Sequence, residues 1–222
     1  MSYVPDFSSV LAKLGIMLLS VRYTLLLAVI ALAGGSIIGL AIALLRLSGP
    51  RVLRIFAGLY INFFRGIPQL VYLVWLYFGI TLLTGIDLSP IVAASVALAT
   101  QYGGYLAEIY RAGIQAIGRG QTEAAMSVGF TKAQTYRFIV LPQAIRIVIP
   151  PLGNMWAGAL KDSALVSTLG VMELMRTTML HANLAWRPFE FYTTAALIYV
   201  ILVWLSAKGV SRLERSFRYE VA

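Results

Sequence analysis

Long runs of apolar residues, separated by short basic and polar segments, divide the whole chain. Five of these runs predict helices that cross a bilayer, because a crossing needs roughly 20 consecutive apolar residues. The runs are 23–45, 66–86, 88–107, 147–172 and 191–207. Two adjacent charges interrupt the fourth run, and the fifth needs flanking residues to complete its crossing. Residues 7–19 predict a further helix, amphipathic or partly buried, that leads into the first run. The pattern indicates an all-α membrane protein with five transmembrane helices.

Small residues in the first run indicate where this helix meets a neighbour. Ala31, Gly35 and Gly39 recur every four residues and therefore share one helix face. Such a face lets two helix backbones approach closely in lipid, where hydrophobicity does not drive helices together. Packing within the chain and a contact in a dimer are equally compatible with this spacing.

The lysines and arginines decide how the five helices are oriented. An odd number of crossings places the two termini on opposite sides of the membrane. Of the 18 basic residues, 12, between Arg46 and Arg218, fall on one side, 4 fall on the other, and Arg65 and Lys161 lie within spans. Cytoplasmic loops carry the excess of basic residues. The N-terminus is therefore predicted outside and the C-terminus in the cytoplasm.

Composition agrees with this topology. With 59% apolar and 12% charged residues, the chain lacks the polar surface of a water-soluble domain. The net charge of +9 follows from the basic cytoplasmic loops, and its spread over several loops argues against nucleic-acid binding. The chain has no cysteine, which excludes disulfides and thiolate metal sites. Without an internal repeat or linker, residues 1–222 are interpreted as a single transmembrane domain.

The polar segment between the third and fourth runs carries a distinctive spacing of residues. Glu123, Ala124 and Ala125 are followed after three residues by Gly129, and after nine more by the sequence Ile-Val-Leu-Pro at 139–142. The small residues Ala124, Ala125 and Gly129 predict a narrow stripe on a short helix. A stripe of this kind suits close docking against another protein surface.

The local residues predict how this segment folds. Thr122 is expected to cap the short helix and to place Glu123 in its first turn, where the helix dipole favours an anion. Gly129 is expected to end that helix in a left-handed conformation. A second short helix is expected from Thr131 to Pro142, since proline cannot continue a helix but begins one well.

This spacing resembles the EAA loop of the membrane subunits of ATP-binding-cassette (ABC) importers. Further segments resemble the permeases for polar amino acids in particular: 60–70, 105–114, 120–121, 141–144 and 160–162. The resemblance covers the chain from Tyr23 to Tyr199. It departs after residue 162, where Ser163-Ala164-Leu165 stands in place of the family's usual Thr-Ser-Leu. The identity of the amino acid therefore stays open among arginine, histidine, glutamine and glutamate.

The resemblance implies a type I importer permease in the cell's inner membrane. Two permease subunits, identical or paralogous, would pair above two ABC ATPase subunits, which alone bind ATP and Mg²⁺, and a substrate-binding protein would deliver the amino acid. This chain would then hold no cofactor of its own. The loop over about 119–142 would contact the ATPase, with the coupling residues Glu123, Ala124, Ala125 and Gly129.

Four charged residues within or beside the apolar runs are candidate substrate contacts. A charge inside a bilayer costs at least ~2.5 kcal/mol, so each needs a partner. Lys161 and Asp162 could hold the carboxylate and amino group of a zwitterion, or could form structural salt bridges at a dimer interface. Arg65 and Glu108 could contact substrate, although an ion pair between them is the favoured interpretation.

The sequence gives little support to other classes of protein. The lone histidine, His181, falls in an outer loop, and we find neither a nucleophile with a base nor a metal-ligand cluster. The chain lacks the Gly-Lys-Ser/Thr sequence that cradles ATP phosphates. An enzyme is therefore not expected. An ion-driven secondary transporter is the main alternative, but such carriers usually contain paired repeats. A receptor or scaffold is a third class, disfavoured by the charges within the spans.

Overall fold

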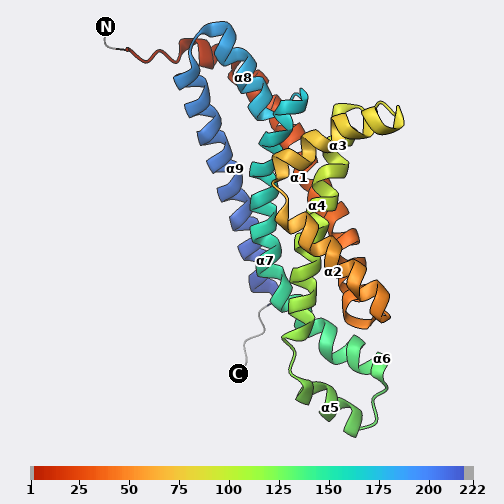
Figure 1. Ribbon diagram of the computed structural model, residues 1–222. Coiled ribbons are helices and arrows are strands. Elements are labelled where there is room, and N and C mark those ends of the chain that lie inside the picture. The colour runs from red at the N-terminus through yellow and green to blue at the C-terminus, as the bar shows by residue number, and fades with distance from the viewer. Residues whose placement is uncertain (1–2, 218–222) are drawn as a thin grey trace. The chain divides into compact units, whose positions relative to one another are not determined.

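The computed structural model describes residues 3–217, and this range is helical with no strand (Figure 1). The residues at the two ends, including Arg218, lie outside the described range. In chain order the elements are α1 (Ser8–Ser48), α2 (Arg51–Gly66), α3 (Gln69–Thr84), α4 (Pro90–Gln115), α5 (Arg119–Ser127), α6 (Lys132–Thr135), the π-helix η1 (Tyr136–Val140), α7 (Leu141–Asp162), the 3₁₀ helix η2 (Ser163–Leu169), α8 (Leu174–Ala185) and α9 (Pro188–Phe217).

Three stretches of helix in the described range are long and apolar enough to cross a membrane: Ser8–Ser48, Lys132–Leu169 and Pro188–Arg212. A fourth is added if the bent pair α2 and α3 is counted as one broken span. Most of the third predicted run falls in α4, which begins at Pro90 and is not among these candidates. The count of five crossings and their orientation therefore remain predictions.

Two predicted helix boundaries are corrected by the structure. The helix predicted over residues 66–86 is shorter in the structure, because Gly66 is the last residue of α2 and α3 runs from Gln69 to Thr84. Pro68 lies at the break, with an extended ψ of 130°, and it has no N–H to continue the helical hydrogen bonds. Residues 8–19 are helical as expected, whereas Phe7 is not, and they form the first part of α1, a single helix of 41 residues.

The chain divides into two compact units, each assembled from separate stretches of sequence. Within the described range, unit 1 comprises 3–32, 67–99 and 156–206, and unit 2 comprises 33–66, 100–155 and 207–217. The core of unit 1 gathers side chains from α1, α8 and α9, and they are Val10, Met17, Leu174, Ala182, Phe191, Ala195 and Ile198. Unit 2 contains the segment 119–142.

A buried carboxylate organises the start of α8 in unit 1. Glu173 is fully buried and accepts hydrogen bonds from the backbone N–H groups of Met175 at 2.8 Å and Arg176 at 2.7 Å. The hydroxyl of Tyr199 on α9 donates to the same carboxylate at 3.0 Å. Burial raises the pKa of Glu173 to about 7, although these donors oppose the shift. Glu173 thus caps α8 and ties it to α9.

Unit 2 is held together by a close approach of α1 and α4. A side-chain carbon added at Gly35 would lie 2.7 Å from Cβ of Tyr102, and one added at Gly39 would lie 2.9 Å from the backbone nitrogen of Ala107. Real Cβ atoms essentially never approach closer than 3.0 Å. The stripe of small residues in the first run therefore packs within the chain, which answers the question that the sequence left open.

Candidate functional site

The helix α5 carries the Glu123 segment, and it begins earlier than predicted. Gly118 occupies the N-cap position with an extended backbone, and no side chain caps the helix. The backbone N–H of Gln121 bonds to the carbonyl of Gly118 at 3.0 Å. The predicted cap at Thr122 is therefore wrong. Because the extended conformation that precedes the helix occurs at Gly118, the helix has already begun at Thr122, and Thr122 and Glu123 both lie within it.

The end of α5 follows the prediction. Gly129 has a φ of +91°, a conformation that other residues adopt only with strain. The backbone N–H of Phe130 donates to the carbonyl of Ala125 at 3.1 Å, and that of Gly129 donates to Met126 at 3.1 Å. This left-handed ending supplies hydrogen-bond donors to backbone carbonyls that have no partner in the last turn of the helix. The turn fixes the direction in which the chain leaves α5.

The next helix also begins where the sequence predicts. Thr131 and Gln134 form a reciprocal capping box at the start of α6, with the Gln134 N–H bonded to Oγ1 of Thr131 at 3.3 Å. The predicted stop at Pro142 is wrong, since α6 passes through η1 into α7. The N–H of Leu141 reaches back five residues to the carbonyl of Tyr136. Such a π-helical turn adjusts the hydrogen-bond register just before proline removes a donor.

The four predicted coupling residues differ in exposure. Ala125 is buried inside unit 2, with 6% of its surface exposed, whereas Glu123, Ala124 and Gly129 are exposed. Three larger apolar side chains around them are also exposed, and they are Met126, Val128 and Phe130. The outer face of α5 therefore combines one carboxylate with small and apolar groups, while Ala125 anchors the helix from behind.

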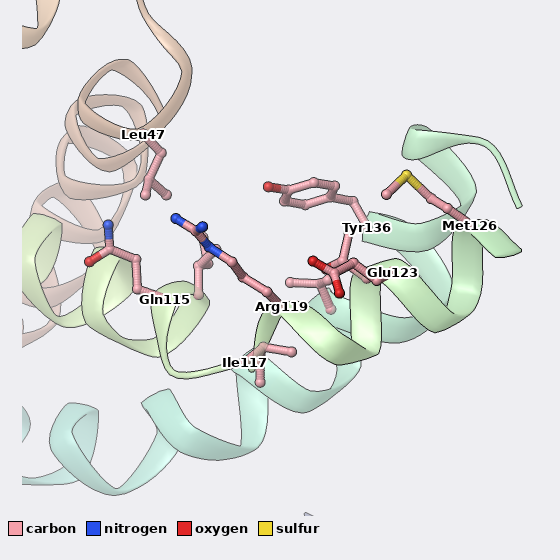
Figure 2. A pocket seen from close by; sticks show the side chains of 10 residues that line it. Leu47, Gln115, Ile117, Arg119, Glu123, Met126 and Tyr136 are labelled. Atoms are coloured by element: carbon pink, nitrogen blue, oxygen red, sulfur yellow. The ribbon is translucent and has the colours of Figure 1, made fainter.

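An open cavity of about 620 Å³ lies beside α5 within unit 2 (Figure 2). Its lining comes from the ends of α1 and α4, from the connection between α4 and α5, from α5 and from η1. The lining residues are Leu47, Ile114, Gln115, Ile117, Arg119, Thr122, Glu123, Met126, Tyr136 and Val140. Figure 2 shows Arg119, Glu123, Met126 and Tyr136 around this space. Charged, aromatic and apolar groups thus surround a hollow large enough to accept side chains of another protein.

The predicted substrate residues Lys161 and Asp162 lie in unit 1, at the point where the helix type changes. The α-helix α7 ends at Asp162, and the 3₁₀ helix η2 begins at Ser163. Lys161 is exposed and Asp162 is half-buried. A change of helix type inside a predicted span is frequent at functional positions. The two charges therefore stand where the regular α-helix is interrupted.

Arg65 and Glu108 lie in unit 2, but the ion pair predicted between them is not formed. Glu108 instead bonds Arg111, one turn further along α4, with 2.9 Å between its Oε2 and Nε of Arg111 and a second contact through Nη2. Residues three apart on a helix are neighbours, so this pair forms within one element. Arg65 and Glu108 nevertheless line one cavity.

That cavity has a volume of about 230 Å³ and includes two arginines that sequence reasoning missed. Its lining is Arg46, Gly58, Ile61, Asn62, Arg65, Glu108 and Arg111. Arg46 donates from Nη1 to the backbone carbonyl of Arg54 at 2.9 Å. The spacing of Gly58, Asn62 and Arg65 on one helix face is a signal that could have revealed this site.

The chain belongs to the family described as "Binding-protein-dependent transport system inner membrane component", whose model matches residues 35–218. It is 38% identical over 199 residues to the "Probable amino-acid permease protein YxeN" of Bacillus subtilis, covering 89% of each chain. It is 34% identical to the "Histidine/lysine/arginine/ornithine transport system permease protein HisQ" of Salmonella typhimurium, covering 93% of this chain and 94% of the relative. The family assigned from the sequence is thereby confirmed.

Solved structures agree with this membership. The chain matches a protein in the "Crystal structure of an amino acid ABC transporter with histidines" with a TM-score of 0.91 and 36% identity, over 96% of this chain and 100% of that one. It also matches a chain of an inward-facing MetNI methionine ABC transporter with a TM-score of 0.80 and 21% identity, a likeness of fold alone. The chain is therefore an all-helical permease component with the type I importer fold, and it is a membrane protein.

Proposed function

We propose that this chain is the translocating subunit of an importer for polar amino acids, and that it works by ATP-driven alternating access. The two relatives named above support the substrate class, since their names describe permeases for amino acids and for histidine, lysine, arginine and ornithine. Each aligns with more than four-fifths of this chain. In the proposal the whole chain acts as one permease domain with five crossings, its N-terminus outside the cell.

The observation that carries the coupling proposal is the outer face of α5. This helix is short, begins at Gly118, ends at the left-handed Gly129 and is held from behind by the buried Ala125. Glu123 and Ala124 lie exposed on it. A helix fixed at both ends moves as a rigid element. Closure of the ATPase pair is thus transmitted to the spans by displacement of α5.

The proposed partners follow from the same mechanism. Two ATPase subunits bind ATP and Mg²⁺ and hydrolyse the nucleotide, a second permease subunit completes the pathway, and a binding protein delivers the amino acid outside. Lys161 and Asp162 are proposed to hold the carboxylate and amino group of the substrate, since an amino acid zwitterion requires one charge of each sign. The protein is proposed to be a multi-pass component of the inner membrane.

The test compares two glycines with the same backbone conformation. Gly129 and Gly85 have φ values of +91° and +72°, and neither has an atom within 4 Å of an added Cβ. Alanine at either position thus introduces the same kind of strain, about 1–2 kcal/mol, without a clash. The purified chain should co-elute with its ATPase and stimulate ATP hydrolysis. Gly129→Ala should weaken this stimulation at least several-fold, and Gly85→Ala should not.

Equal effects of the two substitutions would remove α5 from the coupling mechanism and reduce Gly129 to a structural residue. Failure of the unaltered chain to bind any ABC ATPase would contradict the proposed function itself. Gly129→Asp, which adds a charge to the same turn, should abolish coupling while leaving insertion into the membrane intact.

A further inference from the structure

The last helix, α9, is the least covered of the three candidate spans in the described range. In its most apolar stretch 11% of the residues are buried, compared with 28% and 22% in the stretches of the other two. Its large apolar side chains that are more than half exposed include Leu197, Ile201, Trp204 and Leu205. These side chains are therefore available to lipid along the helix.

The same face of α9 becomes basic where the span ends. The candidate span ends at Arg212, and the helix continues to Phe217. Lys208, Arg212 and Arg215 are spaced four and three residues apart, so they lie within about 60° of one another around the helix. All three are exposed, and we call them the basic stripe. The exposed apolar residues named above widen this arc to about 100°. One face of α9 is thus apolar within the span and basic at its end.

The opposite face of this helix end packs inward within unit 2. A Cβ added at Gly153 on α7 would lie 2.3 Å from Cγ1 of Val210, so Val210 packs directly against the backbone of α7. Val210 lies about 140–160° around the helix from the members of the basic stripe. Glu214, the acidic residue of the segment 207–217, occupies a helix position at least about 100° from each of them. The basic stripe therefore faces away from α7.

Two members of the basic stripe have donors available for a group from outside the chain. Neither Arg212 nor Arg215 makes a hydrogen bond or an ion pair with a side chain that the structure describes. A guanidinium presents its N–H groups as a planar fork that matches a phosphate oxyanion. Basic residues directly beyond a membrane span attract anionic phospholipids, and each strengthens the attraction about fivefold. A lipid also covers the apolar part of this face, which an acidic protein surface would leave exposed.

We propose that the basic stripe of α9 binds the phosphate headgroups of anionic phospholipids in the leaflet at the C-terminal end of this helix. The orientation predicted from the sequence makes this the cytoplasmic leaflet. The headgroup phosphate accepts hydrogen bonds from Arg212 and Arg215, while the acyl chains lie along Leu197, Ile201 and Leu205. The site recognises negative charge in a lipid, and it is separate from the contacts proposed for the amino acid and for the ATPase.

The experiment measures which lipids stay bound to the purified full chain in a non-ionic detergent. Phosphatidylglycerol and phosphatidylcholine with identical acyl chains are added in equal amounts, and native mass spectrometry counts each lipid on the protein. The unaltered chain should retain phosphatidylglycerol in preference. In the double variant Arg212→Gln/Arg215→Gln, the ratio of bound phosphatidylglycerol to phosphatidylcholine should fall about tenfold or more, because two charges worth about fivefold each are lost.

Two control variants and the salt dependence separate charge at the basic stripe from other effects. Lys132→Gln removes an exposed positive charge from α6, away from the basic stripe, and should leave the ratio unchanged. Arg212→Lys/Arg215→Lys keeps both charges and should retain most of the preference. Raising the salt concentration from about 0.1 M to about 1 M shortens the reach of a charge from about 10 Å to about 3 Å. High salt should therefore lower the ratio for the unaltered chain toward that of the double glutamine variant.

Three results would overturn the lipid site. The first is a double glutamine variant that keeps the full preference for phosphatidylglycerol. The second is an equal loss of preference in Lys132→Gln, since net charge and not the basic stripe would then select the lipid. The third is loss of co-elution with the ATPase in the double glutamine variant with the lipid preference retained, which would assign the basic stripe to a protein partner. Because the lipid measurement uses the permease alone, a failure of the proposed transport function would leave its result unchanged.

Discussion

The close approach of α1 and α4 makes the most quantitative prediction, which concerns Gly39→Ala. The added Cβ would lie 2.9 Å from the backbone nitrogen of Ala107, 2.9 Å from Cβ of Leu106 and 3.0 Å from the carbonyl oxygen of Gly103. Ordinary contacts begin at 3.4 Å, so each falls short by about 0.5 Å. The nitrogen and the oxygen belong to the backbone of α4, and Cβ of Leu106 is bonded directly to that backbone, so none of the three atoms can move aside by rotation of a flexible side chain. The two helices must separate, and overpacking of this kind costs about 1–3 kcal/mol.

A matched control is available on the same helix. A Cβ added at Gly15 meets no atom within 4 Å, so Gly15→Ala changes the helix propensity without a clash. Thermal unfolding of both variants in detergent, followed by tryptophan fluorescence, should show Gly39→Ala less stable than Gly15→Ala by about 1–3 kcal/mol. Equal midpoints for the two variants would refute the packing of α1 against α4.

Three further predictions concern pH, topology and the substrate. Because the pKa of Glu173 is raised to about 7 in the fold, the unfolded chain loses its proton first as pH rises above about 4.5. The free energy of unfolding should therefore fall by about 3 kcal/mol between pH 4.5 and 7. Glu173→Gln should remove this dependence on pH. The same pH dependence in the variant and in the unaltered chain would contradict the burial of the carboxyl. The chain has no native cysteine, and Val128 and Leu184 are 74% and 78% exposed, so single cysteines can be labelled at both positions. Leu184→Cys should react with a membrane-impermeant reagent in intact cells, and Val128→Cys should react only after permeabilisation. The reverse pattern would overturn the predicted orientation. Asp162→Asn should weaken amino acid binding at least tenfold, or about 1.4 kcal/mol, without lowering the temperature midpoint of unfolding. A lower midpoint with unchanged binding would show that Asp162 stabilises the fold and does not contact the substrate.

Features set by a few neighbouring residues were predictable from the sequence. Gly129 ends α5 with a positive φ, and Thr131 begins α6 through a capping box, because both signals act within four residues of the chain. The stripe with Gly35 and Gly39 correctly indicated a close helix contact, although the spacing could not name α4 as the partner. The family followed from the residues around Glu123 and from the other resembling segments.

Features set by competition between local alternatives were not predictable. Gly118 begins α5 before Thr122 can cap it, and a π-helical turn carries the chain past Pro142. The sequence offered Glu108 two arginines as partners, and the ion pair forms with Arg111 on the same helix and not with Arg65. The spacing of Gly58, Asn62 and Arg65 along α2 indicates one wall of the polar cavity, but it cannot identify α1 and α4, which supply the other walls.

The central claim is that ATP hydrolysis by a partner drives amino acid uptake through this chain. The direct measurement is uptake of radiolabelled amino acids into proteoliposomes that contain the permease and its ATPase, with the binding protein outside. We predict uptake that requires ATP inside the vesicles and the binding protein outside, and that persists when ionophores collapse all ion gradients. Uptake that proceeds without ATP and stops when the ion gradient is removed would contradict the claim and identify an ion-driven carrier.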